Sequence, residues 1–210
     1  MQVVQIFWIV ILVFSAVAHE VAHAYAAFRL GDPTASLAGR ITLNPAKHLD
    51  PFGSILLPLL LVFSGAPLFA WAKPVPVNPY NLRGRWGPAI VSAAGPLTNF
   101  GLAIVFGLAI RFIFSLVFVP VTLVQITAIV VLMNINLGLF NLLPIPPLDG
   151  SKVLFALLPY KYLYVRNFFE RYGFVLLLLF IFFLSSVLMP ITSFLFDLIV
   201  GSHLSAFISI

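Results

Sequence analysis

The 210-residue sequence contains no cysteine and very few charged residues. The absence of cysteine excludes disulfide bonds, thiolate metal ligands and cysteine nucleophiles. Only 8% of the residues are charged, whereas a soluble domain carries about 25%. A chain so poor in charge cannot cover a surface that faces water. Its composition is 62% hydrophobic with a mean hydropathy of +1.13, which indicates that most of the surface faces lipid.

The net charge of +5 comes from basic residues that are scattered between apolar runs. Scattered basic loops are typical of the cytoplasmic side of membrane proteins, whereas nucleic-acid binding needs a concentrated basic patch. We therefore expect the lipid bilayer, and no nucleic acid, as a partner. The stretch from Met1 to Ala18 lacks the basic start and the cleavage site of a signal peptide, so we expect it to be kept as part of a membrane span.

Apolar segments of about 20 residues, the length that crosses a bilayer, recur along the chain. They predict an all-α polytopic membrane protein with about five transmembrane helices. We expect one membrane-embedded domain over residues 1–210. The expected spans are residues 3–30, 88–112, 113–143 and 172–189, and a final apolar segment after Pro190 that either spans or lies at the interface.

The apolar segment from Pro51 to Ala72 is interrupted by Pro58, Gly65 and Pro67. Basic residues lie both before and after it. All of these basic loops face the cytoplasm only if the segment enters the membrane and returns. We therefore expect a re-entrant or β-hairpin segment between the first and second full spans. An ordinary span is the alternative.

A possible metal site lies in the first span, which contains His19-Glu20-Val21-Ala22-His23, an H-E-x-x-H sequence. Residues four apart share one face of a helix, so both imidazoles can bind one zinc ion while Glu20 reaches a water bound to it. Polar groups in an apolar helix are costly unless they are paired or face water. This setting favours a functional site over the alternative, a satisfied polar cluster between helices.

Asp149 is the candidate for a third ligand, because a catalytic zinc site uses three protein ligands and one open position. It lies in the stretch from Asn141 to Gly150, where three prolines prevent a regular helix and Gly150 lets the backbone turn. Non-helical backbone at membrane depth is tolerated where it lines a water-filled cavity. Asp149 could instead cap a helix that begins near Ser151. Together with the histidine motif, the ligand interpretation is favoured.

These motifs, in this order, resemble the site-2 protease family of intramembrane zinc metalloproteases. That family combines H-E-x-x-H with an N-x-x-P-x-x-x-D-G-like motif in a later span, which Asn141 to Gly150 resembles. Gly95 to Asn99 resembles its G-P-x-x-N element, and Gly39 to Gly53 its connection after the first span. The resemblance is to a compact member without a PDZ or CBS domain. It covers a catalytic core of about residues 1–158, followed by C-terminal helices at about 159–210.

The resemblance implies a site and an activity. One Zn²⁺ ion would be held by His19, His23 and Asp149, with Glu20 as the catalytic base. Asn141 and Asn99 would line the site. For Asn141 two roles stay open, the stabilisation of an oxyanion and the support of a broken helix.

The implied protein is a multi-pass zinc metalloendopeptidase of a prokaryotic cell membrane. It would hydrolyse peptide bonds in or near the transmembrane helix of a membrane-protein substrate, in regulated intramembrane proteolysis or in clearance of membrane peptides. A catalytically inactive zinc-binding scaffold is one alternative, although such a scaffold has no use for Glu20. A metal transporter is another, but it predicts polar residues at several depths, whereas here they cluster.

Overall fold

The computed structural model describes residues 2–56, 60, 63, 73–113, 119–159 and 162–202. In these residues the chain is helical and no strand occurs, which confirms the predicted all-α class. The elements in chain order are α1 (Gln2–Arg29), α2 (Thr34–Leu37), η1 (Pro45–Lys47), η2 (Pro51–Leu56), η3 (Pro79–Asn81), α4 (Gly87–Leu108), η4 (Ala109–Ile113), α5 (Val121–Asn141), α6 (Asp149–Leu157) and α7 (Leu163–Val200).

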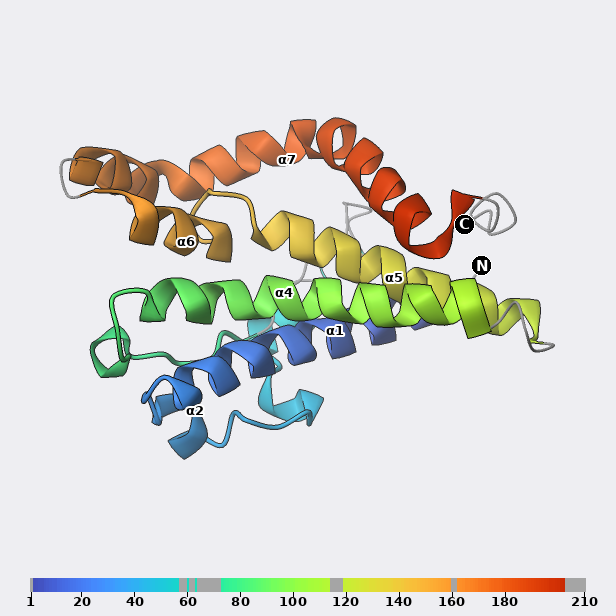
Figure 1. Cartoon of the computed structure of the whole chain (residues 1–210), viewed down its shortest axis with the longest axis horizontal. Helices are drawn as coiled ribbons and strands as arrows, with labels where there is room; N and C mark the ends of the chain where they lie inside the picture. The colour runs from blue at the N-terminus through green and yellow to red at the C-terminus, as the bar shows by residue number, and fades with distance from the viewer. Residues whose placement is uncertain are drawn as a thin grey trace.

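Three helices in the described part are long and apolar enough to cross a membrane. They run over Phe7–Arg29, Gly87–Phe112 and Val121–Asn141. The sequence predicted about five such spans. The two expected at the C-terminal end, separated at Pro190, form the single helix α7, which bends along its length (Figure 1). A proline inside a helix removes one hydrogen bond and kinks the helix without necessarily ending it.

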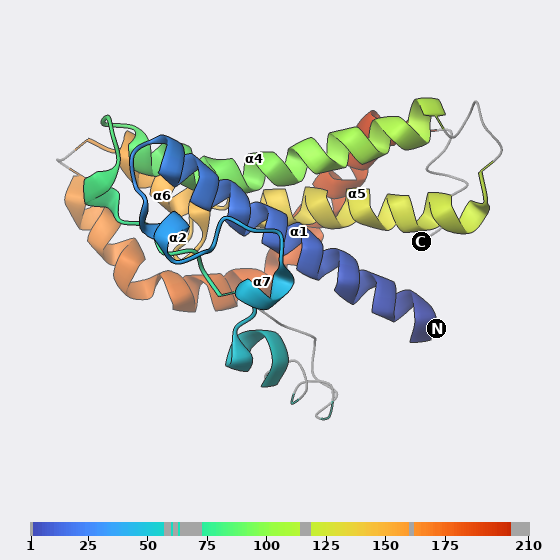
Figure 2. The same cartoon turned by 90° about the horizontal axis from the view of Figure 1, so that it is seen from below.

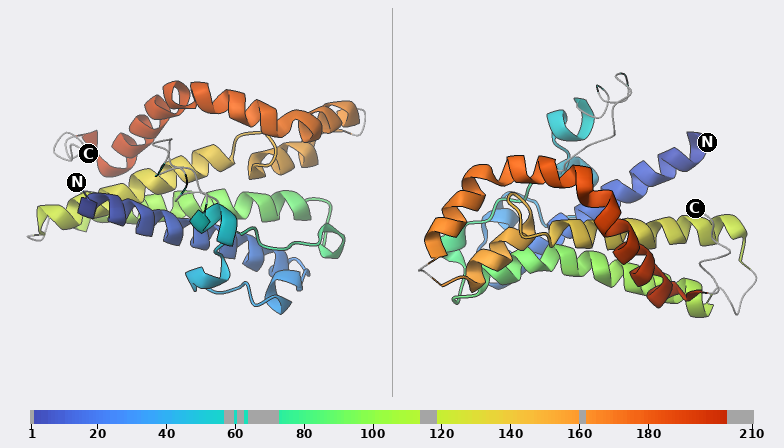
Figure 3. Two further views of the ribbon diagram at one scale, coloured as in Figure 1. Left: turned by 180° about the vertical axis from the view of Figure 1, so that it is seen from behind. Right: turned by 90° about the horizontal axis from the view of Figure 1, so that it is seen from above.

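The three candidate spans pack side by side, with α4 in contact with both α1 and α5 (Figures 1 and 2). The C-terminal half of α7 lies across this group and contacts α4 and α5 (Figure 3). The buried apolar core joins α4, η4, α5 and α7, and consists of Ala103, Ile110, Ala128, Val131, Ile135, Phe196 and Val200. Small residues allow this close approach: a Cβ atom on Gly107 would overlap Ile199 of α7.

The segment expected to re-enter the membrane, Pro51 to Ala72, lies largely outside the described residues. Its first six residues form the π-helical turn η2 (Pro51–Leu56). From Lys73 the described chain continues without regular structure to η3 and then enters α4.

Candidate metal centre

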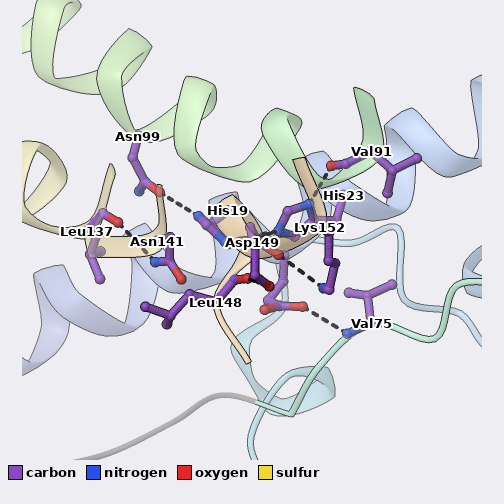
Figure 4. A network of polar contacts seen from close by, with 12 residues as sticks. His19, His23, Val75, Val91, Asn99, Leu137, Asn141, Leu148, Asp149 and Lys152 are labelled. Atoms are coloured by element: carbon purple, nitrogen blue, oxygen red, sulfur yellow. Dashed lines mark hydrogen bonds and ion pairs between the residues drawn. The ribbon is translucent and has the colours of Figure 1, made fainter. Parts of the chain in front are cut away.

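Three side chains converge between α1 and the start of α6 (Figure 4). The Nε2 atoms of His19 and His23 each lie 3.0 Å from Oδ2 of Asp149, and 3.0 Å from one another. All three residues are buried. The structure therefore brings together the two histidines and the carboxylate that the sequence singled out.

Asp149 reaches the histidines because the chain reverses between α5 and α6. The reversal contains a cis peptide bond between Pro146 and Pro147. A Cβ atom on Gly150 would overlap the carbonyl group of Leu142, so only glycine permits this close return. Asp149 is the first residue of α6, and the residue that caps the helix is Leu148. The alternative that Asp149 is the helix cap is therefore wrong.

Helix α4 approaches the histidines at Gly95. A Cβ atom at this position would lie 2.5 Å from Nε2 of His19 and 2.5 Å from Nε2 of His23. Real Cβ atoms do not come so close to other heavy atoms. Gly95 therefore has a steric role: it leaves room for the two imidazole nitrogens against the backbone of α4.

A chain of buried hydrogen bonds determines which nitrogen of His19 carries a proton. The side-chain amide of Asn134 donates to the carbonyl of Val130 and to Ser15, so Oδ1 of Asn134 is the acceptor for Nδ2 of Asn99. Oδ1 of Asn99 then accepts from Nδ1 of His19 at 2.6 Å. Because a backbone carbonyl can only accept, the direction of every bond follows from Val130. In a neutral ring the lone pair of His19 is thus on Nε2.

His23 is oriented in the same way by a backbone group. Its Nδ1 donates to the carbonyl of Val91 at 2.7 Å, so the neutral ring also presents a lone pair at Nε2. Two nitrogen lone pairs and the Asp149 carboxylate oxygen then point at one another. A single proton would satisfy one of these three contacts and leave the others repulsive. A cation between them satisfies all three.

The three atoms fit a zinc ion by chemistry and by spacing. Zinc is bound by imidazole nitrogen and carboxylate oxygen at about 2.0–2.2 Å in tetrahedral geometry, which places neighbouring ligand atoms roughly 3.3 Å apart. The ligand atoms of His19, His23 and Asp149 lie 3.0 Å from one another, which is close to this spacing. The polar contacts at Nδ1 of the two rings are the outer partners that metal-binding histidines generally have.

Glu20 lies next to His19 on α1, and its carboxylate contacts another part of the chain. Oε2 of Glu20 accepts a hydrogen bond of 2.8 Å from the backbone amide of Val75. The segment around Val75 is held at both ends: the amide of Lys73 donates to the carbonyl of His48, and the amide of Asn78 donates to Asp32. The segment Lys73–Asn78 therefore lies directly beside the proposed base.

Asn141 and Asn99, the other two predicted site residues, differ in their contacts. Asn99 is fully buried and contacts His19 directly. Asn141 ends α5, and its side-chain amide donates to the carbonyl of Leu137 one turn earlier. A hydrogen bond to the backbone of its own helix is what the helix-supporting role requires.

Sequence reasoning missed Ser15, Asn134 and Lys152. Ser15 lies one helical turn before His19, and Asn134 lies two turns before Asn141, so helical spacing alone could have placed both on the faces of the site. The ammonium group of Lys152 lies 3.2 Å from Oδ1 of Asp149, and its side chain is 58% exposed. Lys152 thus bonds the carboxylate oxygen that does not face the histidines.

The comparison with known proteins identifies a family of peptidases. The family model described as Peptidase family M50 matches residues 7–121 and 116–184. "Putative zinc metalloprotease YwhC" of Bacillus subtilis is 40% identical over 181 residues, which are 81% of this chain and 77% of the relative. "Putative zinc metalloprotease Rip2" of Mycolicibacterium smegmatis is 35% identical over 147 residues, 65% of this chain and 51% of the relative. No solved structure matches the chain.

Proposed function

The chain belongs to peptidase family M50, and from this premise we propose that it is an intramembrane zinc endopeptidase. Its substrates would be membrane proteins, cut in or near a transmembrane helix. The observation that carries the proposal is the convergence of two imidazole lone pairs and one carboxylate, with Glu20 adjacent in the chain. The names of the relatives, zinc metalloproteases, support the choice of metal and of reaction.

In this proposal His19, His23 and Asp149 would hold one zinc ion. The chemistry supplied by bound zinc would be a water molecule with its pKa lowered to about 7 and a polarised scissile carbonyl. Asn99 keeps the proton of His19 on Nδ1, and the Val91 carbonyl does the same for His23. Both rings therefore stay in the tautomer that binds metal.

Glu20 would take the proton of the attacking water and pass it to the leaving amine, which is general acid–base catalysis. Its Oε2 atom is held by the Val75 amide, which leaves Oε1 for the water. Asn141 is a candidate donor to the oxyanion that develops on the scissile carbonyl. To do so, its side-chain amide must break the hydrogen bond to the Leu137 carbonyl and donate to the substrate instead.

The setting of the site supports a substrate within the membrane. His19, Glu20 and His23 all lie in the candidate span Phe7–Arg29, in its second half. The two other candidate spans pack against this helix. A soluble peptide would have to enter this apolar environment, whereas a single-span membrane protein already lies in it. We therefore propose a multi-pass protein of the cell membrane, and the bacterial origin of the relatives supports a prokaryotic source.

The test uses purified zinc-loaded protein in lipid nanodiscs with a single-span model substrate. Wild type should cleave it. Glu20→Gln should bind zinc normally and cleave about 10²–10⁴ times more slowly, the usual contribution of a general base. Glu170→Gln is the matched control, because Glu170 pairs with Arg166 on the exposed face of α7, outside the described site. It should cleave like wild type.

Three results would contradict the proposal. Cleavage by Glu20→Gln at the wild-type rate would exclude Glu20 as the base. Wild-type protein that binds the substrate and zinc but leaves every peptide bond intact would be the inactive scaffold. Zinc flux into proteoliposomes, without cleavage, would identify a transporter.

A further inference from the structure

A pocket of about 450 Å³ lies where the connection after α1 meets the segment from Lys73 to Pro76. Three basic side chains line it, those of Arg40, Lys47 and Lys73, and none of the described residues that line it is acidic. The remaining lining is apolar. Pro74 and Pro76 have no amide hydrogen, and the backbone amides of the other lining residues already donate within the chain. Recognition in this pocket therefore depends on side chains.

Arg40 is the buried member of this group. It is only 6% exposed, and Nη2 of its guanidinium donates to the carbonyl groups of Lys73 and Pro74. Its Nε atom is buried and has no hydrogen-bond partner within the described residues. None of the ion pairs found among the described residues includes Arg40. A buried charge without a counter-charge is costly, and an anion in the pocket would supply one.

Lys47 and Lys73 are exposed residues that line the same pocket. With Arg40 they give the pocket three positively charged side chains, which favours the binding of an anion. The fork of a guanidinium matches the oxygens of a phosphate group, and lysine adds charge with few geometric demands. Three cations suit a group that carries one or two negative charges.

We propose that the pocket formed by Arg40, Lys47 and Lys73 binds a phosphate group. The source is either the headgroup of an anionic phospholipid or free inorganic phosphate. A basic pocket beside transmembrane helices is a known kind of site for anionic headgroups, and this pocket lies in the connection that follows the candidate span Phe7–Arg29.

The pocket is connected to the metal centre through the backbone. Arg40 holds the carbonyl groups of Lys73 and Pro74, and the amide of the next residue, Val75, holds Glu20. A phosphate group bound to Arg40 and Lys73 would hold this segment more tightly. Binding should therefore slow hydrogen exchange of the Val75 amide.

The experiment measures binding and requires no proteolysis, so it stands apart from the proposed activity. Zinc-loaded protein is placed in nanodiscs of phosphatidylcholine, either alone with added inorganic phosphate or mixed with phosphatidylglycerol. Native mass spectrometry counts the retained phosphatidylglycerol, and ³¹P NMR titration reports inorganic phosphate. The test variant is Lys47→Gln/Lys73→Gln, which removes two exposed charges and leaves Arg40 in place. The matched control is Arg85→Gln/Arg171→Gln, which removes two exposed charges elsewhere.

Wild type and the control should bind equally, and the test variant should bind roughly tenfold more weakly, because each basic residue contributes measurably to such binding. If the test variant loses only the binding of phosphatidylglycerol, the source is the lipid headgroup. If it loses only the binding of inorganic phosphate, the source is the free anion. Both results support the site. Equal binding by the test variant and the control overturns it, and so does binding that leaves the exchange of peptides containing Val75 unchanged.

Discussion

Gly95 lies so close to His19 that a Cβ atom on the glycine would be 2.5 Å from Nε2 of the imidazole. We therefore predict that Gly95→Ala loses most of its zinc, since its methyl group would push His19 and His23 out of the metal site. The control is Gly101→Ala on the same helix, where an added Cβ atom meets nothing within 4 Å. Zinc content per protein, measured by inductively coupled plasma mass spectrometry, should fall only in Gly95→Ala.

The same pair of variants separates a local effect from misfolding. An alanine in a helix is intrinsically more favourable than a glycine, by up to about 1 kcal/mol, so Gly101→Ala should unfold at or above the wild-type temperature. A Gly95→Ala protein that carries a full complement of zinc would show that the histidines do not bind metal in the arrangement described.

Asn134 lies outside the metal site but orients it through Asn99. We predict that Asn134→Ala lowers the affinity for zinc by about 10–100-fold, the usual effect of removing an outer hydrogen-bond partner of a metal ligand. Asn136→Ala is the control, because Asn136 lies on the same helix and bonds Thr192 of α7. Competition with a fluorescent zinc chelator measures both affinities. An equal loss in the two variants would assign the effect to the packing of α5.

Removal of zinc should destabilise the protein, because two imidazole lone pairs and a carboxylate then face one another without a cation. A chelator should lower the midpoint of thermal unfolding, and added zinc should restore it. At a free zinc concentration one hundred times the Kd, zinc binding adds about 2.7 kcal/mol to the free energy of unfolding. Magnesium, which prefers oxygen ligands, should not restore the midpoint. A midpoint that does not respond to the chelator would contradict metal binding at this site.

Asp32 ties the connection after α1 to the segment that carries Val75. It is fully buried and accepts hydrogen bonds from Thr34, Asn78 and Asn81. Burial alone would raise the pKa of the Asp32 carboxyl, but these hydrogen bonds outweigh it and lower the pKa below its ordinary value of 3.8. The stabilisation from Asp32 is therefore complete above pH 3.8 and is lost as the pH falls towards the lower folded-state value.

Two measurements test the lowered pKa of Asp32. Asp32→Asn should lower stability by about 2–3 kcal/mol at neutral pH, because the amide accepts fewer hydrogen bonds than the carboxylate. The stability of this variant should also fall less than that of wild type when the pH is lowered, because it has no carboxyl group to protonate at position 32. The exposed Asp197 offers the matched control Asp197→Asn, with an expected change within about 0.5 kcal/mol. Identical acid-unfolding curves for wild type and Asp32→Asn would contradict the assignment.

Much of the candidate site could be predicted from local patterns. The spacing of His19 and His23 places both imidazoles on one helix face, and the prolines before Asp149 predict a chain reversal there. The π-helical turn at Pro51–Leu56 and the extent of α7 could not be predicted in the same way. Pro190 looked like the end of a helix in the sequence, yet α7 continues through it with a bend.

By itself the sequence determined the helical class, the lipid-facing composition and the identity of the residues that converge. These properties depend on side-chain chemistry and on spacing within one helix, which the sequence states directly. Only the tertiary structure decided which atoms meet: Asp149 with His19 across 130 residues, Asn134 behind Asn99, and the Val75 amide on Glu20. Such contacts depend on how separate helices and connections pack, which cannot be predicted from the periodicity of a single segment.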